Sequence, residues 1–394
     1  MKYVLTTLSP VHIGSGDQIS NWSYTFDNGK IKIYNFEKVV RALKNNPQRL
    51  LNLTAIIERN PLTKNLGDIL KDFKLSIEPT YISELKGSVK TGRNEYKQIW
   101  EFIRENSQVY IPGTEIKGAI RTALFYKILK DKFNEDEKIK NQFLNEYKNC
   151  LNVKHFRDER DKKKQIKKNF SYLEQRWESI VFRAGFQKVF DKDFKFADAK
   201  KDILKILLIS DSNLKNPNDI LNIKDITALG VSRHFEELHE LLKSGSNFIV
   251  DLRVPFNSEY KKIFPETFIY LGMKKIREAC SEFALNVIES DIEYFNKTKE
   301  IKEDQKSKIL EKLEKRKNLA KISPEKKYII LRLGKHQGFL STTINLLVKE
   351  FNPELYSEAY GYLVHRGYPD FPNKSRKLTI DNELLGWCVL TQKK

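Results

Sequence analysis

Leu331-Arg-Leu-Gly-Lys-His-Gln-Gly-Phe-Leu-Ser-Thr-Thr343 is the stretch that decides the fold. Gly334 and Gly338 let the backbone approach a ligand closely and turn amide groups outward. Arg332 and Lys335 add positive charge, so the pattern predicts a loop that cradles phosphates; the alternative is an ordinary surface turn between a strand and a helix. The spacing Gly-x-x-x-x-Gly-Lys-Ser/Thr of a P-loop is absent, so nucleotide hydrolysis is not supported. The other polar candidates in this glycine-rich loop are His336, Ser341 and Thr342.

A second motif lies upstream, Tyr110-Ile-Pro-Gly-Thr-Glu-Ile-Lys-Gly-Ala-Ile-Arg-Thr-Ala-Leu124. Its Pro-Gly turn precedes Thr114, a suitable N-cap, and predicts an amphipathic helix that ends near Lys130. Lys117 and Arg121, four residues apart, place two charges on one face near a helix N-terminus, which favours anions. A phosphate fits such a site; the alternative is a capped helix with a solvated basic face.

A third motif, Ser9-Pro-Val-His-Ile-Gly-Ser-Gly16, follows a predicted strand over residues 2–8. His12 could be a general base, because imidazole titrates near neutrality, or it could contact a nucleotide. A structural histidine packed beneath the glycine turn is the alternative. His234 and His239, five residues apart, do not share a helix face as zinc ligands at i and i+4 would. Neighbouring carboxylates for metal-assisted chemistry are also lacking, so we predict no metal site and no cofactor.

The predicted elements follow the order β-α-β-β-α-β, with insertions between them. This order is typical of the α+β class and of the ferredoxin-like fold found in RNA-recognition (RRM) sheets. A hairpin at Asn28-Gly29 is also predicted. The other expected elements are strands over 203–211, 247–256, 328–333 and 385–391, and helices over 267–296 and 341–350.

We predict two RRM-like halves. The N-terminal domain, residues 1–245, carries helical insertions over about 36–105 and 131–200. The C-terminal half, residues 246–394, carries the glycine-rich loop at 334–343 and a charged helical arm over about 297–327. Because this arm is rich in lysine and glutamate, we expect it to be solvated and to contribute little core.

The composition limits the class of protein and the kind of partner it binds. Lys and Arg number 71 against 52 Asp and Glu, so the net charge is +19. A basic protein of this kind most often binds nucleic acid, with an anionic membrane surface or an acidic protein as lesser options. Aromatic residues make up 11% of the chain, which is too many for a disordered one. The cysteines, Cys150, Cys280 and Cys388, are far apart and show no CxxC spacing, which predicts buried thiols in a reducing cytoplasm.

The three motifs, in this order, resemble the RAMP superfamily of CRISPR-associated RNA-binding proteins. Within it, the glycine-rich loop, the 110–124 motif and the length are most similar to the fifth-subunit family of type III-A (Csm) effector complexes. The resemblance implies an RRM-like RAMP fold, contact with CRISPR RNA at its 3′ end, and stacking on the repeated backbone subunit. The positions it implies for RNA contact are His12, Gly14, Ser15, Gly16, Gly113, Lys117, Arg121, Arg332, Gly334, Lys335, His336, Gly338, Ser341 and Thr342.

Charge and glycine turns predict an RNA-binding subunit, and the resemblance implies that it is non-catalytic and supports CRISPR RNA maturation and complex assembly. Its expected partners are CRISPR RNA, the backbone and small Csm subunits, and recruited host nucleases. Bases are expected to stack on aromatic side chains such as Trp22, Tyr24, Phe26 or Phe339. One alternative is a metal-independent endoribonuclease with His12 as general base. Another is a scaffold whose basic stretches, 154–168 and 297–327, bind an acidic nuclease.

Overall fold

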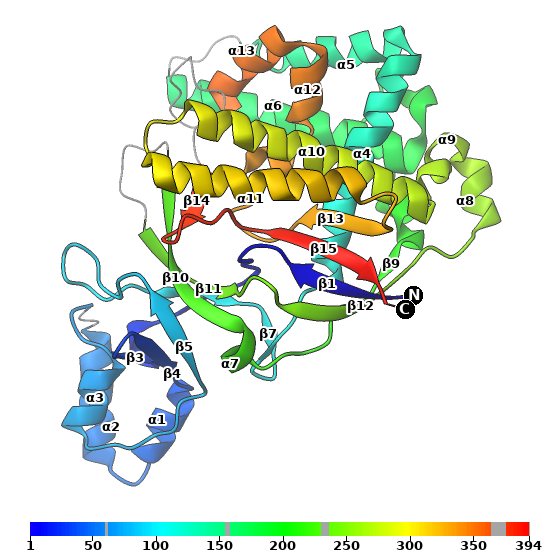
Figure 1. The fold of residues 1–394 in the computed structure, drawn as a ribbon. Coiled ribbons are helices and arrows are strands. Elements are labelled where there is room, and N and C mark those ends of the chain that lie inside the picture. Colours follow the sequence, from blue (N-terminus) through cyan, green and yellow to red (C-terminus); the bar gives the residue numbers. More distant parts are fainter. Residues whose placement is uncertain (60–61, 154–157, 230–235, 364–375, 394) are drawn as a thin grey trace.

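The computed structural model describes residues 1–59, 62–153, 158–229, 236–363 and 376–393. Across these ranges, one antiparallel sheet has five strands in the order β13-β15-β1-β12-β9 (Figure 1). Strand β1 lies at its centre and pairs with both β12 and β15. Tyr3 and Leu5 of β1 are buried on one face, as the alternation of a half-buried strand predicts. The strands of this first sheet are β1 (Lys2–Thr7), β9 (Leu208–Ile209), β12 (Asn247–Arg253), β13 (Tyr328–Arg332) and β15 (Trp387–Gln392).

A second sheet has the order β2-β6-β11-β10-β5-β4-β3, with β14 also paired to β10, within the described residues. Strands β5 and β10 run parallel, as do β6 and β11. The predicted hairpin is confirmed: β3 and β4 pair around Asn28 and Gly29, which both have positive φ. The strands are β2 (Gly14–Ile19), β3 (Tyr24–Asp27), β4 (Lys30–Ile33), β5 (Tyr81–Lys86), β6 (Ile99–Phe102), β10 (Leu221–Leu229), β11 (Glu236–Leu242) and β14 (Arg376–Thr379). A separate ribbon consists of β7 (Arg104–Glu105) and β8 (Gln108–Val109).

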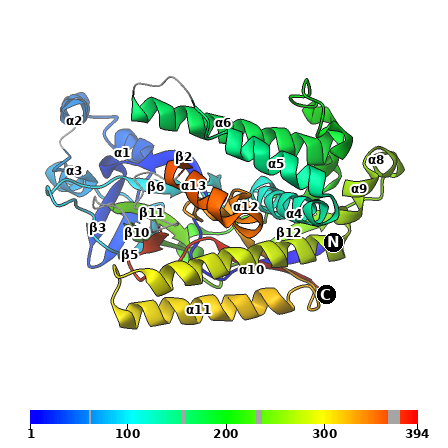
Figure 2. The ribbon, with the colours of Figure 1, turned by 90° about the horizontal axis from the view of Figure 1, so that it is seen from above.

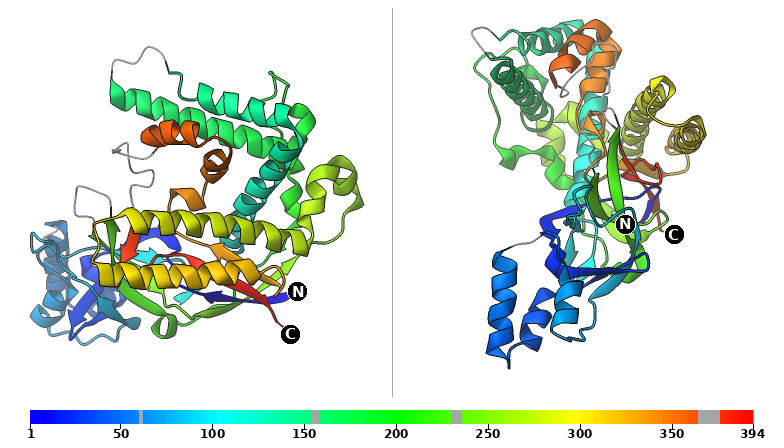
Figure 3. Two further views of the ribbon diagram at one scale, coloured as in Figure 1. Left: turned by 45° about the horizontal axis from the view of Figure 1, so that its top comes forward. Right: turned by 90° about the vertical axis from the view of Figure 1, so that its left-hand side faces the viewer.

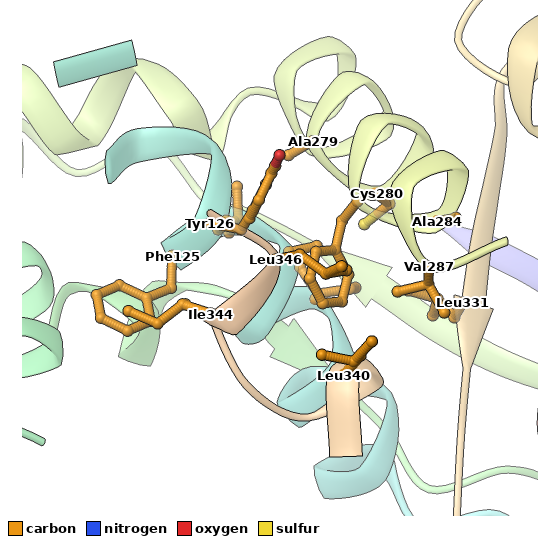
Figure 4. Packing of buried hydrophobic residues seen from close by; sticks show 14 of the residues in the cluster. Phe125, Tyr126, Ala279, Cys280, Ala284, Val287, Leu331, Leu340, Ile344 and Leu346 are labelled. Carbon is orange, nitrogen blue, oxygen red and sulfur yellow. The ribbon is translucent and has the colours of Figure 1, made fainter. Parts of the chain in front are cut away.

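Helices α4 and α10 pack on each other and on β13, and α11 lies along α10 (Figures 1 and 2). The core between them is apolar: Tyr126 of α4 points toward Ala279 of α10, and Phe125 of α4 lies beside Ile344 (Figure 4). The three cysteines are free and buried, as predicted. The long helices here are α4 (Gly113–Glu135), α10 (Met273–Lys297) and α11 (Glu303–Ile322).

The remaining helices form two groups at different ends of the molecule. Three helices of the N-terminal insertion stand beside β3, β4 and β5, and a second group lies above α4 and α10 (Figure 3). The first group is α1 (Phe36–Ala42), α2 (Pro47–Glu58) and α3 (Leu66–Asp72). The second is α5 (Glu137–Asn149), α6 (Glu159–Ser179), α12 (Asn345–Phe351) and α13 (Pro353–Leu363). Short helices are α7 (Pro217–Ile220), α8 (Ser258–Ile263) and α9 (Pro265–Phe268).

Four expectations need correction. The insertion predicted to be helical over 36–105 is helical only as far as Asp72, and β5 and β6 follow it. The strand expected over 203–211 is a 3-10 turn followed by the two residues of β9. The long helix expected from residue 267 begins at Met273, because Gly272 has an extended backbone. Helix α4 begins at Gly113 with Pro112 as its N-cap residue, not with Thr114.

The charged arm is also different from its prediction. Helix α11 packs on α10 through Ile309, Leu313 and Ala320, which are buried. These residues recur every four and seven positions, so one stripe of the helix faces the core although its composition is charged. The arm therefore contributes core, and only its outer face is solvated.

The first sheet combines strands from both predicted halves, because β1 lies between β12 and β15. The division into two domains at residue 245 stays a prediction. Within the described ranges, no helix is both long enough and apolar enough to cross a membrane.

Candidate functional site

The glycine-rich loop leaves β13 and turns back on the first segment of the chain. The amide of Lys335 donates a hydrogen bond of 2.8 Å to the carbonyl oxygen of His12. Gly334 has φ +79°, and a Cβ atom at this position would overlap the same oxygen. Gly334 is therefore required both for its backbone conformation and for the close approach. The structure thus joins two of the three motifs.

Part of the predicted phosphate cradle lies beneath the loop instead of on its surface. Arg332 is buried, and its Nη1 lies 3.0 Å from Asp291 Oδ2 and 3.3 Å from Ser341 Oγ. Arg376 also binds Asp291, which is buried. Together with loop residues, these groups line a cavity of about 150 Å³. Arg332 and Ser341 therefore hold the loop on the sheet.

Other loop residues face solvent. Lys335, Gly338 and Thr342 are exposed. The Nζ atom of Lys335 lies 3.5 Å from the ring centroid of Trp100, a half-buried residue of β6, in a cation–π contact. Lys377 of β14 lies close enough to Lys335 for mutual repulsion, and burial lowers the pKa of Lys377 to about 8. This combination of cations, aromatic ring and glycine turns fits a nucleic-acid backbone.

His12 is not on that surface. Its side chain is 0% exposed, and its Nδ1 lies 2.8 Å from the carbonyl oxygen of Glu240. Burial lowers the pKa of His12 to about 4, so the ring is neutral at pH 7. Gly14, Ser15 and Gly16 of the same motif are exposed and form the first half of β2. The motif therefore exposes its glycines and buries its histidine.

His12, His239 and His336 form a histidine cluster below the loop. The ring centroids of His12 and His239 are 4.6 Å apart, and those of His239 and His336 are 4.7 Å apart. Burial lowers the pKa of both His239 and His336 to about 2, and the lysines nearby act in the same direction. All three rings are therefore neutral at pH 7.

The sequence did not identify His239, Glu237 or Trp100 as site residues. Glu237 and His239 are two residues apart on β11, so their side chains share one face of the strand. The i, i+4 spacing of helical zinc ligands fits neither this pair nor His234 with His239. An i, i+2 spacing in a strand is the signal that could identify Glu237 and His239. Trp100 lies beside His239 because β6 and β11 pair in parallel, which no spacing in the sequence indicates.

The second motif is not part of this surface. The amide of Gly113 at the start of α4 donates to Asp211 Oδ1 at 2.7 Å, so a carboxylate of the chain already occupies the predicted phosphate position. Arg121 is paired with Glu178 and Asp202, and burial lowers the pKa of Lys117. These positions remain predicted RNA contacts, but the structure gives Gly113 and Arg121 clear structural roles.

The aromatic residues predicted to stack on bases also differ in their exposure. Trp22 and Tyr24 are buried, so they are core residues and offer no ring to a base. Phe26 is 42% exposed on the edge strand β3. Phe339 is half-buried at the base of the glycine-rich loop. Among the predicted stacking residues, only these two present accessible rings in the described structure.

The fold and the glycine-rich loop define a class of protein. The model of the RAMP superfamily matches residues 4–334, and the chain belongs to this superfamily. A curated protein of Methanocaldococcus jannaschii, named CRISPR system Cms protein Csm5, is 24% identical over 425 residues, which cover 99% of this chain and 88% of that protein.

Two solved structures share the fold. A chain of the cryo-EM structure of a Csm-crRNA-target RNA ternary complex in a type III-A CRISPR-Cas system superimposes with a TM-score of 0.74 and 22% identity. That match covers 99% of this chain and 100% of the other. The crystal structure of T. onnurineus Csm5 gives a TM-score of 0.67 at 22% identity and covers 98% of this chain and 99% of that one. These matches confirm the predicted α+β class and the predicted RAMP fold.

Proposed function

We propose that this chain is the Csm5-type subunit of a type III-A effector ribonucleoprotein and that it binds CRISPR RNA without cleaving it. The observation that carries the proposal is the match over nearly the full chain to a subunit of a Csm complex that contains CRISPR RNA. The relative of M. jannaschii supports the same assignment. Its partners would be CRISPR RNA and the repeated and small Csm subunits. Host nucleases would be recruited for maturation, in the cytoplasm.

The exposed part of the glycine-rich loop is the proposed RNA contact. Lys335 carries its charge on the face of Trp100, and Gly338 lets the loop backbone approach a phosphate. Such a surface binds the sugar–phosphate backbone and does not distinguish bases. Sequence recognition then belongs to base pairing by the guide RNA.

Burial of His12 supports a binding role over the endoribonuclease alternative. A general base must come within hydrogen-bond distance of the proton that it removes, about 2.6–3.2 Å. The side chain of His12 has no exposed surface, and the loop backbone covers it through the bond from Lys335. We infer that His12 positions the loop and takes no proton from RNA.

Fluorescence anisotropy with a labelled single-stranded CRISPR RNA tests the RNA contact. Lys335→Ala should weaken binding about 3- to 10-fold at low salt and reduce the slope of log K against log salt by about 0.7, because one phosphate contact is lost. Lys315→Ala is the matched control, since it removes one charge from the outer face of α11. Lys335→Arg should restore most of the affinity.

Equal binding by wild type and Lys335→Ala would contradict the proposed contact. A gel of the same samples, run with EDTA, checks the second half of the proposal. The RNA should remain intact. Cleavage by wild type that is lost in His12→Ala would favour the endoribonuclease.

A further inference from the structure

Three side chains outside the Lys335–Trp100 contact meet where the glycine-rich loop lies on β11. They are Glu237 and His239 of β11 and His336 of the loop, and one ligand atom from each lies within 4.8 Å of the others. His239 is fully buried, whereas the Glu237 side chain is 32% exposed. The group is therefore fixed on its sheet side and accessible from solvent on the other.

Two of the three spacings are close to those of a tetrahedral metal centre, and the third, between Glu237 and His336, is within 4.8 Å. Nε2 of His239 lies 3.1 Å from Glu237 Oε2 and 3.3 Å from Nε2 of His336. Zinc binds imidazole nitrogen and carboxylate oxygen at about 2.0–2.2 Å, so neighbouring ligands of a tetrahedron are about 3.3–3.6 Å apart. A single proton on Nε2 of His239 would have to serve two acceptors, whereas a cation can accept all three lone pairs together.

The loop backbone holds the third ligand in an unusual conformation. His336 has φ +70°, in the left-handed region that residues other than glycine seldom occupy. The preceding residue is tied to His12 through its amide, so the direction of the His336 side chain is set by the fold. Strained backbone of this kind is concentrated at sites where a side chain must be aimed.

We propose that Glu237, His239 and His336 bind one divalent transition-metal ion of the zinc class, with a fourth position open to water or a phosphate oxygen. Two imidazoles and a carboxylate are a donor set that suits zinc. The ion would tie the glycine-rich loop to β11. This proposal does not depend on RNA binding, because the ligands come from the chain alone.

Two features of the surroundings set the strength of binding. Lys335 and Lys377 repel positive charge at His336, so they weaken binding of a cation and favour an anion as its fourth ligand. Nδ1 of His239 has no hydrogen-bond partner among the described residues, which leaves the outer shell of that ligand incomplete. Incomplete outer shells lower metal affinity about 10- to 100-fold, so we expect a site weaker than a structural zinc finger.

Isothermal titration of the untagged full-length chain with Zn²⁺ alone, without RNA, tests the site. Wild type should bind one ion that both Glu237→Gln and His336→Gln bind at least about 10-fold more weakly. Glu84→Gln is the matched control, because Glu84 is an exposed glutamate on β5 of the same sheet. Titration with Co²⁺ alone should give the visible absorption of a tetrahedral nitrogen–oxygen site in wild type and in the control.

The proposal is overturned if wild type binds Zn²⁺ no better than the two ligand variants do. Circular dichroism of each variant shows whether it is folded. If His336→Gln does not fold, Glu237→Gln decides, because glutamine keeps the size of the side chain that it replaces. Loss of RNA binding in Lys335→Ala with zinc binding intact would separate this site from the proposed function.

Discussion

At the scale of single residues, burial decides which charged side chains are available for function. Arg332 and Arg121 look alike in sequence as free cations beside glycine motifs, yet both are paired with carboxylates. Lys335 is exposed and has an aromatic ring as its neighbour. Sequence alone predicts that the loop is basic, but it cannot show which cation the fold uses internally.

The proposed metal ligands illustrate the same limit. His336 was a predicted site residue, but His239 comes from a strand 97 positions away in the chain. They meet because the Lys335–His12 bond holds the loop on the first motif, and Val11 of that motif pairs with Leu242 at the end of β11. The i, i+2 spacing of Glu237 and His239 was visible, but its meaning depended on knowing that the segment is a strand.

The half-buried carboxyl group of Glu174 allows a prediction at this scale. Glu174 of α6 is half-buried, and desolvation raises its pKa to about 7. A carboxyl group with a folded-state pKa above its ordinary value favours the fold at low pH, and this contribution is lost as pH rises from about 4.5 through 7. Glu174→Gln should therefore raise the free energy of unfolding by about 1–2 kcal/mol at pH 8, and the gain should shrink toward pH 5.

Urea unfolding at pH 8 and pH 5 measures this change. Glutamine keeps an oxygen that can accept the 3.1 Å bond from the amide of Ile344. Glu314→Gln, on the exposed face of α11, is the control and should show no such pH dependence. A gain of equal size at both pH values would mean that charge is not its cause.

At the scale of elements, the most accurate predictions are those for short segments with turn residues at both ends. Strands β1, β12 and β13 begin and end close to their predicted limits, because turn residues bound each of them. Strands β5 and β6 were placed within a helical insertion, since the segment after Asp72 lacks a comparable hairpin signal. Helix α11 was predicted correctly as a helix, but its buried stripe was hidden by lysine and glutamate.

Two glycines of α4 give a prediction at this scale. A Cβ on Gly113 would lie 2.5 Å from the carbonyl oxygen of Ile209, where α4 meets β9. Gly118 is exposed within the same helix and has open space around it. Gly113→Ala should cost about 2–3 kcal/mol through overpacking, whereas Gly118→Ala should add about 0.5–1 kcal/mol through helix propensity.

The urea midpoints of the two variants test these predicted stability changes. Because both changes add one methyl group to the same helix, their difference isolates the contact with β9. If Gly113→Ala were as stable as Gly118→Ala, the helix start would not be closely packed. The motif glycine would then be explained better by approach of a ligand than by internal packing.

At the scale of the whole molecule, the first and last strands of the described chain pair with each other. Strand β1 opens the sequence and β15 ends the described part of it, and the two pair in the middle of the first sheet. The amide of Lys393 donates to the carbonyl of Lys2 at 2.9 Å, so the two ends of the described chain lie side by side (Figure 1). Local sequence patterns do not contain this information, because nothing near residue 5 indicates a partner near residue 390.

The final prediction concerns the division at residue 245. Residues 246–394 expressed alone lack β1, so β12 and β15 would face each other across an empty position and the core around Tyr3 and Leu5 would be open. We expect this fragment to show no cooperative urea transition. A circular permutant is the control: it starts at Ser246, joins residue 394 to Met1 through a loop of about four residues, and ends at Gly245. It carries the same cut but keeps every strand, so it should unfold cooperatively. If the fragment alone unfolds cooperatively as well, the C-terminal half is a domain in its own right, and the pairing through β1 is an addition to a core that is already complete.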